Sequence, residues 1–585
     1  MKILIFAPHA ETWAHAFPEA LVAESLKKEG HTVLYVGCGM QLQRFCVPMG
    51  SHSLTPAADD AVRHGVCHNC CRNDRMIRKN FGLSGPNLAD LIGRDDEAEI
   101  DRIMAGLSND AMVDFERDNI RIGKFALYQL MLRQKRFNIN FSEAEWRDYR
   151  IEFRNTLYAW QAAKKLIDKE KPDRVLVYNS LYSVNRVVCK LAEQKGIPHY
   201  FAHAGGNLAN RLQTLWVGRG DTFSFMPHLL EQWPRFSKTA CSTAELSWIT
   251  DHYLELLRGA SPFVYSQPKS QSRLDIRTRF GVARNQKLFL ATLGSYDEER
   301  AAELVGARVL EKLPIFATQV DWVKSLLDYI AQRPDRFLLV RVHPREFPNK
   351  REGTLSQHAN ELRRVLTDLP SNAAVNWPDD NVSMYDLADE ADVVLNSWSS
   401  VGKEMALLGI PVVTYAPEII FYPEDIGYSA RSKPDYFAAI ETALTDGWDF
   451  ERIRRCYRWY ALEYIKSAIF LGDDFPKHEG VRRTWRERLI GRIDRTFGLG
   501  LEQILACLGR SGKLGQSQLL AKLFESKSKS IAQLAAPQPA DEIALAMETT
   551  ALRREVRRIA DALFRTPESR STSRLYPVLV AGGQV

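Results

Sequence analysis

Short apolar runs, each followed by a polar turn, recur along the chain and determine the structure that we predict for it. The first run, KILIFA at residues 2–7, is followed by a polar loop, an amphipathic stretch at 14–29 and a second apolar run at 31–37. A strand, a loop, a helix and a strand in this order form the basic unit of a parallel sheet. The alternation returns at residues 172–220. The sequence therefore predicts a Rossmann-like half that begins at the first residue.

A second set of apolar runs begins with KLFLATL at residues 287–293 and continues with FLLVRV at 337–342. Between the two sets, residues 261–272 are rich in Ser, Pro and Gln, which is typical of a linker. We therefore predict an α/β protein with two Rossmann-like domains that face each other across a cleft. The Rossmann glycine fingerprint is missing from the sequence, which argues against a dinucleotide cofactor.

Changes of pattern along the chain give the domain boundaries. We expect the first domain at residues 1–265, with a charged helical insertion at 59–165, and the second domain at 273–450. A basic helical region should follow at 451–525. Residues 526–585 should hold a linker, an amphipathic helix and a flexible tail.

The stretch ADVVLNSWSSVGKEMALLGIPVVTYAP, residues 391–417, is the clearest single unit. A short strand leads into the polar turn 396–400, a helix opens near Gly402, and another strand follows Gly409. Backbone N–H groups and hydroxyls at a helix N-terminus suit a phosphate. Glu404, in the first turn of the helix, is placed to accept hydrogen bonds from ribose or sugar hydroxyls. The alternative is an ordinary crossover in which a serine caps the helix.

His343 and Pro344 directly follow the strand FLLVRV, and Arg341 and Arg345 flank them. The carboxyl ends of parallel strands form the binding edge of such a sheet. An imidazole and two guanidinium groups at that edge suit a phosphate leaving group, because fixed cations stabilise the charge that grows as the bond breaks. The alternative is that both arginines are solvated surface charges.

The composition is that of a globular protein with a substantial core. Of 585 residues, 45% are hydrophobic and 26% are charged, and the net charge of +6 is small for this length. We find no nucleic-acid-recognition signature. The apolar run at the N-terminus is too short for a signal peptide, and no run is long enough to span a bilayer. We therefore expect a cytoplasmic protein, or one at the inner face of the cytoplasmic membrane.

The nine cysteines are odd in number and unevenly spaced, which argues against a disulfide framework. Cys67, Cys70 and Cys71 lie close to His64 and raise the question of a zinc site. A structural zinc site needs four ligands, usually from two such pairs, and the sequence offers no second pair. We expect reduced, partly buried thiols.

VRVHPRE and NSWSSVGKEMALLGIP together resemble the donor half of GT-B glycosyltransferases that assemble bacterial capsules and surface polysaccharides. The resemblance covers residues 287–444. It implies that His343, Ser399 and Ser400 contact the nucleotide and its phosphate, that Gly402 allows close backbone approach, and that Glu404 holds the ribose. In the family the residue after this glutamate is usually Ala, whereas this chain has Met405 there. No DxD-type motif is convincingly placed, so we expect no obligatory metal and no cofactor besides the nucleotide-sugar.

The first half resembles the same fold more loosely, through HAFPEALVAESLKKEGHTVLYVG. The resemblance places His15 at a turn whose histidine touches the acceptor hydroxyl or acts as base in several inverting members. A neutral imidazole near pH 7 is a competent base. A histidine without chemistry is the alternative, and His9 and Glu11 in the same loop are rival acceptor-binding residues.

Three further residues follow apolar runs at expected binding edges. Asp297 comes shortly after KLFLATL and is a candidate base, although it could instead cap a helix. Asn179 follows VLVY, and His203 follows HYFA. Both are candidate acceptor-binding residues.

Residues 452–495 carry twelve Lys and Arg against six Asp and Glu, with Trp459, Tyr460, Tyr464, Phe470 and Trp485 interleaved. Basic charge with interfacial aromatics suits contact with anionic lipid headgroups. A C-terminal helix that crosses back onto the first domain would have the same pattern.

We therefore expect a glycosyltransferase that moves a sugar from a nucleotide-activated donor to a surface polysaccharide, capsule or lipopolysaccharide, or to a lipid-linked glycan. The second domain would bind the donor and the first the acceptor. A nucleotide-sugar epimerase and a teichoic-type polyol-phosphate transferase are alternatives on the same fold. A non-catalytic glycan-binding or assembly protein is the third.

Overall fold

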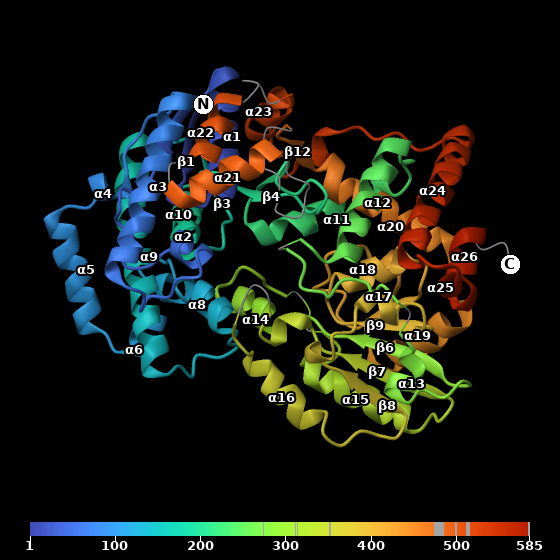
Figure 1. The fold of residues 1–585 in the computed structure, drawn as a ribbon. Helices are drawn as coiled ribbons and strands as arrows, with labels where there is room; N and C mark the ends of the chain where they lie inside the picture. Colours follow the sequence, from blue (N-terminus) through green and yellow to red (C-terminus); the bar gives the residue numbers. More distant parts are fainter. Residues whose placement is uncertain are drawn as a thin grey trace.

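Two six-stranded sheets organise the chain. The computed structural model describes residues 1–582 except 262, 273, 311, 313, 350–352, 473–484, 498–499 and 510–514. Figure 1 shows one sheet among the blue and green helices of the N-terminal half and the other among the yellow and gold elements below it.

The first sheet has the strand order β12-β5-β4-β3-β1-β2. Its parallel strands are β1 (Lys2–Phe6), β2 (Thr32–Val36), β3 (Arg174–Tyr178) and β4 (His199–Ala204). Two antiparallel pairings extend it through β5 (Thr214–Arg219) and β12 (Ala468–Phe470). The core order 2-1-3-4-5 is that of flavodoxin-like sheets, whose direction of winding reverses between β1 and β3.

Helices cover both faces of this sheet. On one face, α1 (Trp13–Lys28) follows β1, and on the other α10 (Ser183–Gln194) packs against α9 (Glu143–Glu170). Ser142 and Glu145 form a capping box that starts α9. The segment between β2 and α9 is helical: α2 (Val47–Ser51), α3 (Asp60–Phe81), α4 (Leu88–Leu91), α5 (Arg94–Gly106), α6 (Asn109–Val113), α7 (Ile122–Phe125) and α8 (Leu127–Gln134).

The second sheet is parallel throughout, in the order β11-β10-β9-β6-β7-β8. Its strands are β6 (Lys287–Thr292), β7 (Arg336–Arg341), β8 (Ala373–Asn376), β9 (Val393–Asn396), β10 (Val412–Thr414) and β11 (Tyr428–Ser429). Numbered from β6, this is the Rossmann order 3-2-1-4-5-6, and the reversal lies between β6 and β9. Helices around it include α14 (Tyr296–Leu304), α15 (Gln319–Ala331), α16 (Gln357–Val365), α18 (Val401–Ala406) and α19 (Lys433–Asp446).

The two halves are joined by buried polar contacts as well as by the chain. Lys135, at the end of α8, is fully buried and donates to the backbone carbonyls of Arg345 (2.5 Å), Thr354 (2.6 Å) and Phe347 (3.1 Å). The Arg345 side chain in turn donates to the carbonyl of Leu132 at 3.0 Å. Since a buried charge is costly unless its hydrogen bonds are satisfied, these contacts fix the segment after β7 against the first half.

After β11 the chain returns to the first half. α20 (Phe450–Ala461) continues into a π-helix, η5 (Leu462–Lys466), and then into β12 of the first sheet. α23 (Ser517–Glu525) packs against α1, and α24 (Glu542–Leu563) packs against α12 (Thr243–Arg258). Figure 1 shows α24, in red, beside α12, in green.

The structure decides between two expectations about this C-terminal part and corrects a third. Trp459, Tyr460 and Tyr464 are buried, because the apolar side of α20 packs on α12 and α18. This segment therefore follows the alternative of a chain that crosses back, and β12 joins the first sheet. The expected flexible tail contains two helices, α25 (Pro567–Thr572) and α26 (Leu575–Ala581). Leu579 of α26 is buried, and α26 packs against α24. This packing explains why the segment is helical although its sequence shows no clear helical periodicity.

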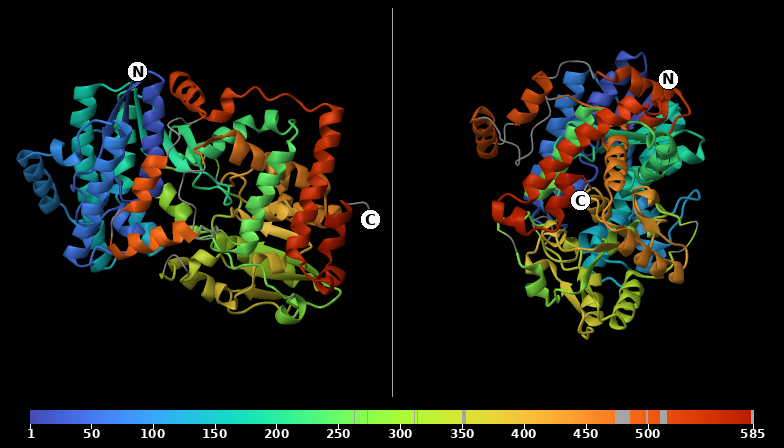
Figure 2. Two further views of the ribbon diagram at one scale, coloured as in Figure 1. Left: turned by 45° about the horizontal axis from the view of Figure 1, so that its top comes forward. Right: turned by 90° about the vertical axis from the view of Figure 1, so that its right-hand side faces the viewer.

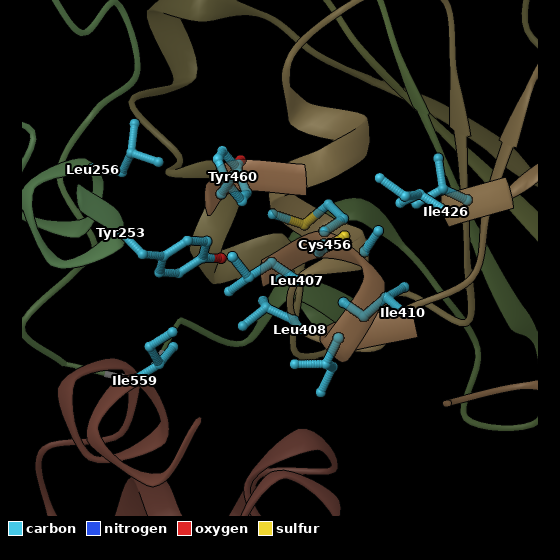
Figure 3. Close-up of a cluster of buried hydrophobic side chains, with 14 of the residues drawn as sticks. Tyr253, Leu256, Leu407, Leu408, Ile410, Ile426, Cys456, Tyr460 and Ile559 are labelled. Carbon is cyan, nitrogen blue, oxygen red and sulfur yellow. The ribbon is translucent and has the colours of Figure 1, made fainter. Parts of the chain in front are cut away.

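A large apolar cluster lies behind α18 and fixes its position. Figure 3 shows the Tyr253 ring of α12 pointing toward Leu407 and Leu408, with Leu256 of the same helix and Tyr460 of α20 above them. Ile559 of α24 closes the cluster from below. The predicted fold class is confirmed: two Rossmann-like units form an α/β protein with added helices.

Candidate functional site

A cavity of about 210 Å³ lies at the point where the second sheet reverses its winding. This is the position at which open α/β sheets bind ligands. The ends of β6 and β7, the turn after β9, and residues of the first half and of α12 and α20 line it. The polar lining residues are Tyr265, Ser266, His252, Thr292, Arg341, His343, Ser399, Ser400, Lys403, Glu404, Tyr460 and Tyr464.

His343 is one of the lining residues, as predicted from the strand end before it. Its Nδ1 accepts a hydrogen bond from the backbone N–H of Arg345 at 3.2 Å. The proton of the neutral ring therefore sits on Nε2, which is left to donate. Burial, reinforced by Arg345, Arg341 and Lys135, lowers the pKa of His343 to about 3. His343 is thus a neutral hydrogen-bond donor at neutral pH.

The two arginines that flank His343 have different environments. Arg341 lines the cavity and donates to the side chain of Asn376 and to the carbonyl of Val382. Burial lowers its pKa to about 10, so the guanidinium keeps its charge at neutral pH. The cation is held inside the protein next to the cavity.

Arg345 does not reach the cavity lining. It is 3% exposed and forms an ion pair with the buried Asp297 at 2.8 Å. Tyr265 accepts a further hydrogen bond at 3.1 Å. Although burial lowers the pKa of Arg345, Glu298 and Asp297 raise it above the ordinary value. The structure therefore separates Arg345 from the other predicted donor-site residues and pairs the predicted base Asp297 with this arginine.

Ser399, Ser400 and Glu404 lie together in the cavity lining, in the turn after β9 and in α18. The hydroxyl of Ser400 donates to Glu404 Oε1 at 2.9 Å, and the hydroxyl of Tyr385 donates to Oε2 at 2.9 Å. Burial raises the pKa of Glu404. Ser399 accepts from the backbone N–H of Val401 at 3.3 Å. Because α18 is only six residues long, recognition at this wall rests on side chains and turn amides rather than on a helix dipole.

Gly402 is required for a reason that differs from the predicted one. A Cβ at this position would come within 2.0 Å of the Tyr422 hydroxyl oxygen and 2.6 Å of Asn396 Nδ2. Gly402 is not among the residues that line the cavity. The glycine therefore lets the turn pack against Tyr422, where the resemblance had implied close approach to a ligand. Pro344, in contrast, does line the cavity.

Lys403 is a cavity residue that sequence reasoning missed. Its ammonium lies 2.6 and 2.9 Å from the two carboxylate oxygens of Glu463, and both side chains are buried. The ammonium also approaches the ring centroids of Tyr460 and Tyr464 to 4.9 and 5.4 Å. Glu463 is sixty positions away, in the π-helix η5, and single-turn π-helices frequently occur at functional sites. No local pattern could have linked the two.

The predicted acceptor-side histidines gather at the carboxyl edge of the first sheet. The ring of His15 stacks on Tyr178 at 4.0 Å, and His203 stacks on the same tyrosine at 5.8 Å. His9 meets Tyr182 edge-on at 5.7 Å. Burial, with contributions from His9 and His203, lowers the pKa of His15 well below its usual value. This histidine cluster (His9, His15 and His203) lies where the first sheet reverses its winding, and its rings are neutral.

The loop after β4 connects the histidine cluster to the cavity. Gly206 and Leu208 line the cavity, and His203 is three residues before Gly206. Arg211 packs over the ring of Phe263, another lining residue, at 4.6 Å. Its charge also lowers the pKa of both His203 and His252, after the larger effect of burial. Arg211 therefore lies between the histidine cluster and the cavity.

Glu11 and Asn179 have structural partners. Glu11 accepts a hydrogen bond from Asn73 at 2.8 Å and pairs with His52 at 3.4 Å, which ties its loop to the helices beside it. Asn179 has a left-handed backbone with φ 55°, and its side chain accepts from the backbone N–H of Leu181 at 3.1 Å. Neither residue lines the cavity.

Five cysteines line one small cavity beside the histidine cluster: Cys38, Cys46, Cys67, Cys70 and Cys71. Burial raises the pKa of Cys38 to about 12, so its thiol stays protonated. Among the residues described, no group of three or more His, Cys, Asp or Glu has the geometry to hold a metal ion. Within the residues that the structure describes, every helix is too short or too polar to cross a membrane.

Comparisons with known proteins give similar solved structures but no sequence relatives. No protein-family model and no curated protein matches the chain. It is similar to the β-Kdo 2,4-transferase of KpsC from Thermosulfurimonas dismutans, with 14% identity, 52% of this chain and 82% of that chain covered, and a TM-score of 0.32.

A UDP-GlcNAc 2-epimerase from Methanocaldococcus jannaschii, solved with UDP-GlcNAc and UDP, is 15% identical over 78% of this chain and 98% of its own, with a TM-score of 0.26. The glycosyltransferase SnogD from Streptomyces nogalater is 12% identical over 78% and 93%, with a TM-score of 0.22. Similarity at this level assigns no activity to the chain.

Proposed function

We propose that the chain is a glycosyltransferase that moves a sugar from a nucleotide-activated donor to a glycan acceptor of a surface polysaccharide or a lipid-linked intermediate. The observation that carries the proposal is the cavity at the reversal of the second sheet. There a fixed cation, a neutral imidazole donor, two hydroxyls and a buried carboxyl converge on one space. These groups match a phosphate joined to a polyhydroxylated sugar.

Each group has a separate task in this proposal. Arg341 and the Nε2–H of His343 stabilise the charge that develops on the leaving phosphate, and such preorganised donors act strongly in a site from which water is excluded. Ser399 donates its hydroxyl to a further phosphate oxygen, and Ser400 does the same once its hydroxyl proton turns away from Glu404. Glu404 accepts hydrogen bonds from ribose hydroxyls.

We infer the position of the acceptor from the volume of the cavity and from Gly206, the lining residue nearest in sequence to the histidine cluster. Ligand pockets usually measure roughly 300–1,000 Å³, so a complete nucleotide-sugar would extend beyond the enclosed 210 Å³. The open direction proposed for the sugar is along Gly206, toward the histidine cluster. His15, neutral and next to two further imidazoles, is the proposed base for the acceptor hydroxyl, with His9 as its rival.

The test begins with nucleotide binding. The wild-type chain is mixed in turn with CMP, CDP, UDP and GDP, and the melting temperature is measured. We expect one of the four to raise it, and we expect His343→Ala to abolish the increase. The proposal fails if no nucleotide raises the melting temperature and if cells carrying His343→Ala make unchanged polysaccharide.

The second step separates the competing activities. A transferase releases nucleotide from the matching nucleotide-sugar quickly only when acceptor glycan is added, and otherwise slowly by hydrolysis. An epimerase interconverts the nucleotide-sugars without acceptor. A binding protein does neither, and either of these two results would replace the proposed activity.

A further inference from the structure

Two helices beyond β12 present large apolar side chains to solvent. In α21 (Trp485–Phe497), Trp485 is 70% exposed and Leu489, one turn later, is 48% exposed. In α22 (Leu501–Gly509), Leu508 is 70% exposed, and Ile504 and Leu505 are also exposed. We call these five side chains the apolar face of α21–α22. A cluster of this kind on one helical pair is uncommon on a monomeric protein surface and marks an interaction site.

The other side of the pair is anchored to the first half. Ala506 and Cys507 are buried in the same core cluster as Ile77 and Phe81 of α3, and Trp13 at the start of α1 packs against that cluster. α22 contacts α3, and α21 contacts α22. Figure 1 shows the pair in orange, lying over the blue helices. In the right-hand view of Figure 2, orange helices extend from the side of the molecule. The apolar face therefore belongs to a helix pair that is fixed to the first half through the other side of α22.

Basic side chains of α21 lie beside the apolar face. Arg486, Arg488 and Arg492 of α21 are exposed. The guanidinium of Arg486 lies over the Trp485 ring at 5.4 Å. Asp494, in contrast, accepts the backbone N–H groups of Leu501 and Glu502 at 2.8 and 3.1 Å. This carboxylate caps α22 and joins the two helices.

We propose that α21–α22 is a docking surface for anionic lipid bilayers. A tryptophan and leucines inserted between headgroups, with arginines at headgroup level, is the arrangement by which amphipathic helices lie in a membrane interface. Basic side chains next to the surface add attraction to anionic lipids. The surface lies apart from the buried aromatics of α20, and the proposal does not depend on the proposed activity.

The arginines beside the apolar face favour an anionic bilayer over a second copy of the chain as the partner of this surface. In a two-fold dimer through this face, the arginines of one copy would meet those of the other, and like charges brought together oppose association. An anionic bilayer meets the same arginines with opposite charge.

The experiment measures partitioning of the full-length protein onto vesicles by flotation. One set of vesicles contains phosphatidylcholine alone, and the other contains phosphatidylcholine mixed with phosphatidylglycerol. We expect the wild type to float with the mixed vesicles and to be released by high salt. The triple variant Trp485→Ser, Leu489→Ser, Leu508→Ser should partition at least tenfold less.

A matched control comes from another helix of the same chain. Ile543 and Met547 of α24 are 73% and 68% exposed and lie one turn apart, next to the acidic residues Asp541 and Glu542. The variant Ile543→Ser, Met547→Ser removes two large exposed apolar side chains and should partition as the wild type does. The thermal unfolding of each variant shows whether it is folded.

Charge is tested separately by Arg486→Glu, Arg492→Glu, which keeps the apolar residues. It should weaken binding to mixed vesicles about tenfold. The proposal is overturned if the wild type does not float with mixed vesicles, or if the triple variant floats as well as the control variant. It is also overturned if sedimentation shows a wild-type dimer that the triple variant abolishes while neither protein binds vesicles.

Discussion

The two sheets place different chemistry at the same topological position. At the reversal of the second sheet, Arg341 is charged at neutral pH and lines the cavity together with Glu404. At the reversal of the first sheet, His9 is buried, His15 and His203 are partly buried against the Tyr178 ring, and all three are neutral at neutral pH. One edge is suited to an anion and the other to transfer of a proton.

Under the proposed function, this difference lets one backbone plan serve two substrates. In a parallel sheet the strand order fixes where a ligand binds, whereas the side chains after each strand decide what binds. We therefore predict that variants of the cavity residues and variants of the histidine cluster change different steps of the proposed reaction. Each of the following changes tests this prediction.

His15→Asn should have the largest effect. Removing a general base typically costs roughly 10²–10⁴-fold in rate, so we expect the sugar-transfer rate to fall about a thousandfold while nucleotide affinity stays the same. Transfer rate and nucleotide titration measure the two quantities. His68→Asn, at an exposed position of α3, is the control and should change neither. Equal loss of nucleotide affinity in His15→Asn would contradict the separation of tasks.

His343→Ala should affect both binding and rate. Loss of one preorganised donor to a developing charge costs roughly 10²–10³-fold in kcat. We therefore expect kcat to fall about a hundredfold together with weaker nucleotide binding. Steady-state kinetics against nucleotide-sugar concentration provide the measurement. Unchanged kinetics would remove His343 from the donor site.

Acid should destabilise both halves through their buried histidines. His9 and His343 have pKa values of about 3, and His203 about 4, because burial disfavours the charged ring. Unfolded histidine titrates near 6.5, so below that pH the unfolded state binds more protons and stability falls. From pH 7 to pH 5, each buried histidine should cost roughly 2 kcal/mol.

Chemical unfolding at both pH values measures this loss. His203→Asn should show a smaller decrease between pH 7 and pH 5 than the wild type, since it has one histidine fewer to protonate on unfolding. An equal or larger decrease in this variant would contradict the explanation.

Glu404→Gln should have the smallest effect. The amide keeps the volume of the side chain and one acceptor oxygen, but loses the charge that strengthens hydrogen bonds to hydroxyls. Hydrogen bonds to charged groups are worth roughly 1.5–3 kcal/mol, so KM for the nucleotide-sugar should rise about tenfold with little change in kcat. A large fall in kcat at unchanged KM would instead assign Glu404 to the chemical step.

The apolar pattern predicted the strands well, because buried parallel strands are continuous apolar runs whose ends are marked by polar turns. For the same reason it predicted that Arg341, His343, Ser399, Ser400 and Glu404 would meet, since all of them follow or end strands of one sheet.

Other features depend on contacts that a local pattern does not contain. Arg341 and Arg345 look equivalent in sequence, yet Arg345 pairs with Asp297, 48 positions earlier. Lys403 enters the site through Glu463, sixty positions later. The π-helix that carries Glu463 lies in a stretch whose aromatics suggested a surface, but Trp459, Tyr460 and Tyr464 around it are buried in the core. Long-range pairing of this kind is decided by tertiary packing.

Hydrogen–deuterium exchange, with the nucleotide among CMP, CDP, UDP and GDP that most raises the melting temperature, tests the division of tasks most directly. The account predicts that this nucleotide slows amide exchange at residues 341–345 and 397–404 and leaves residues 9–16 unchanged. Slower exchange at 9–16, with no change at 397–404, would contradict it.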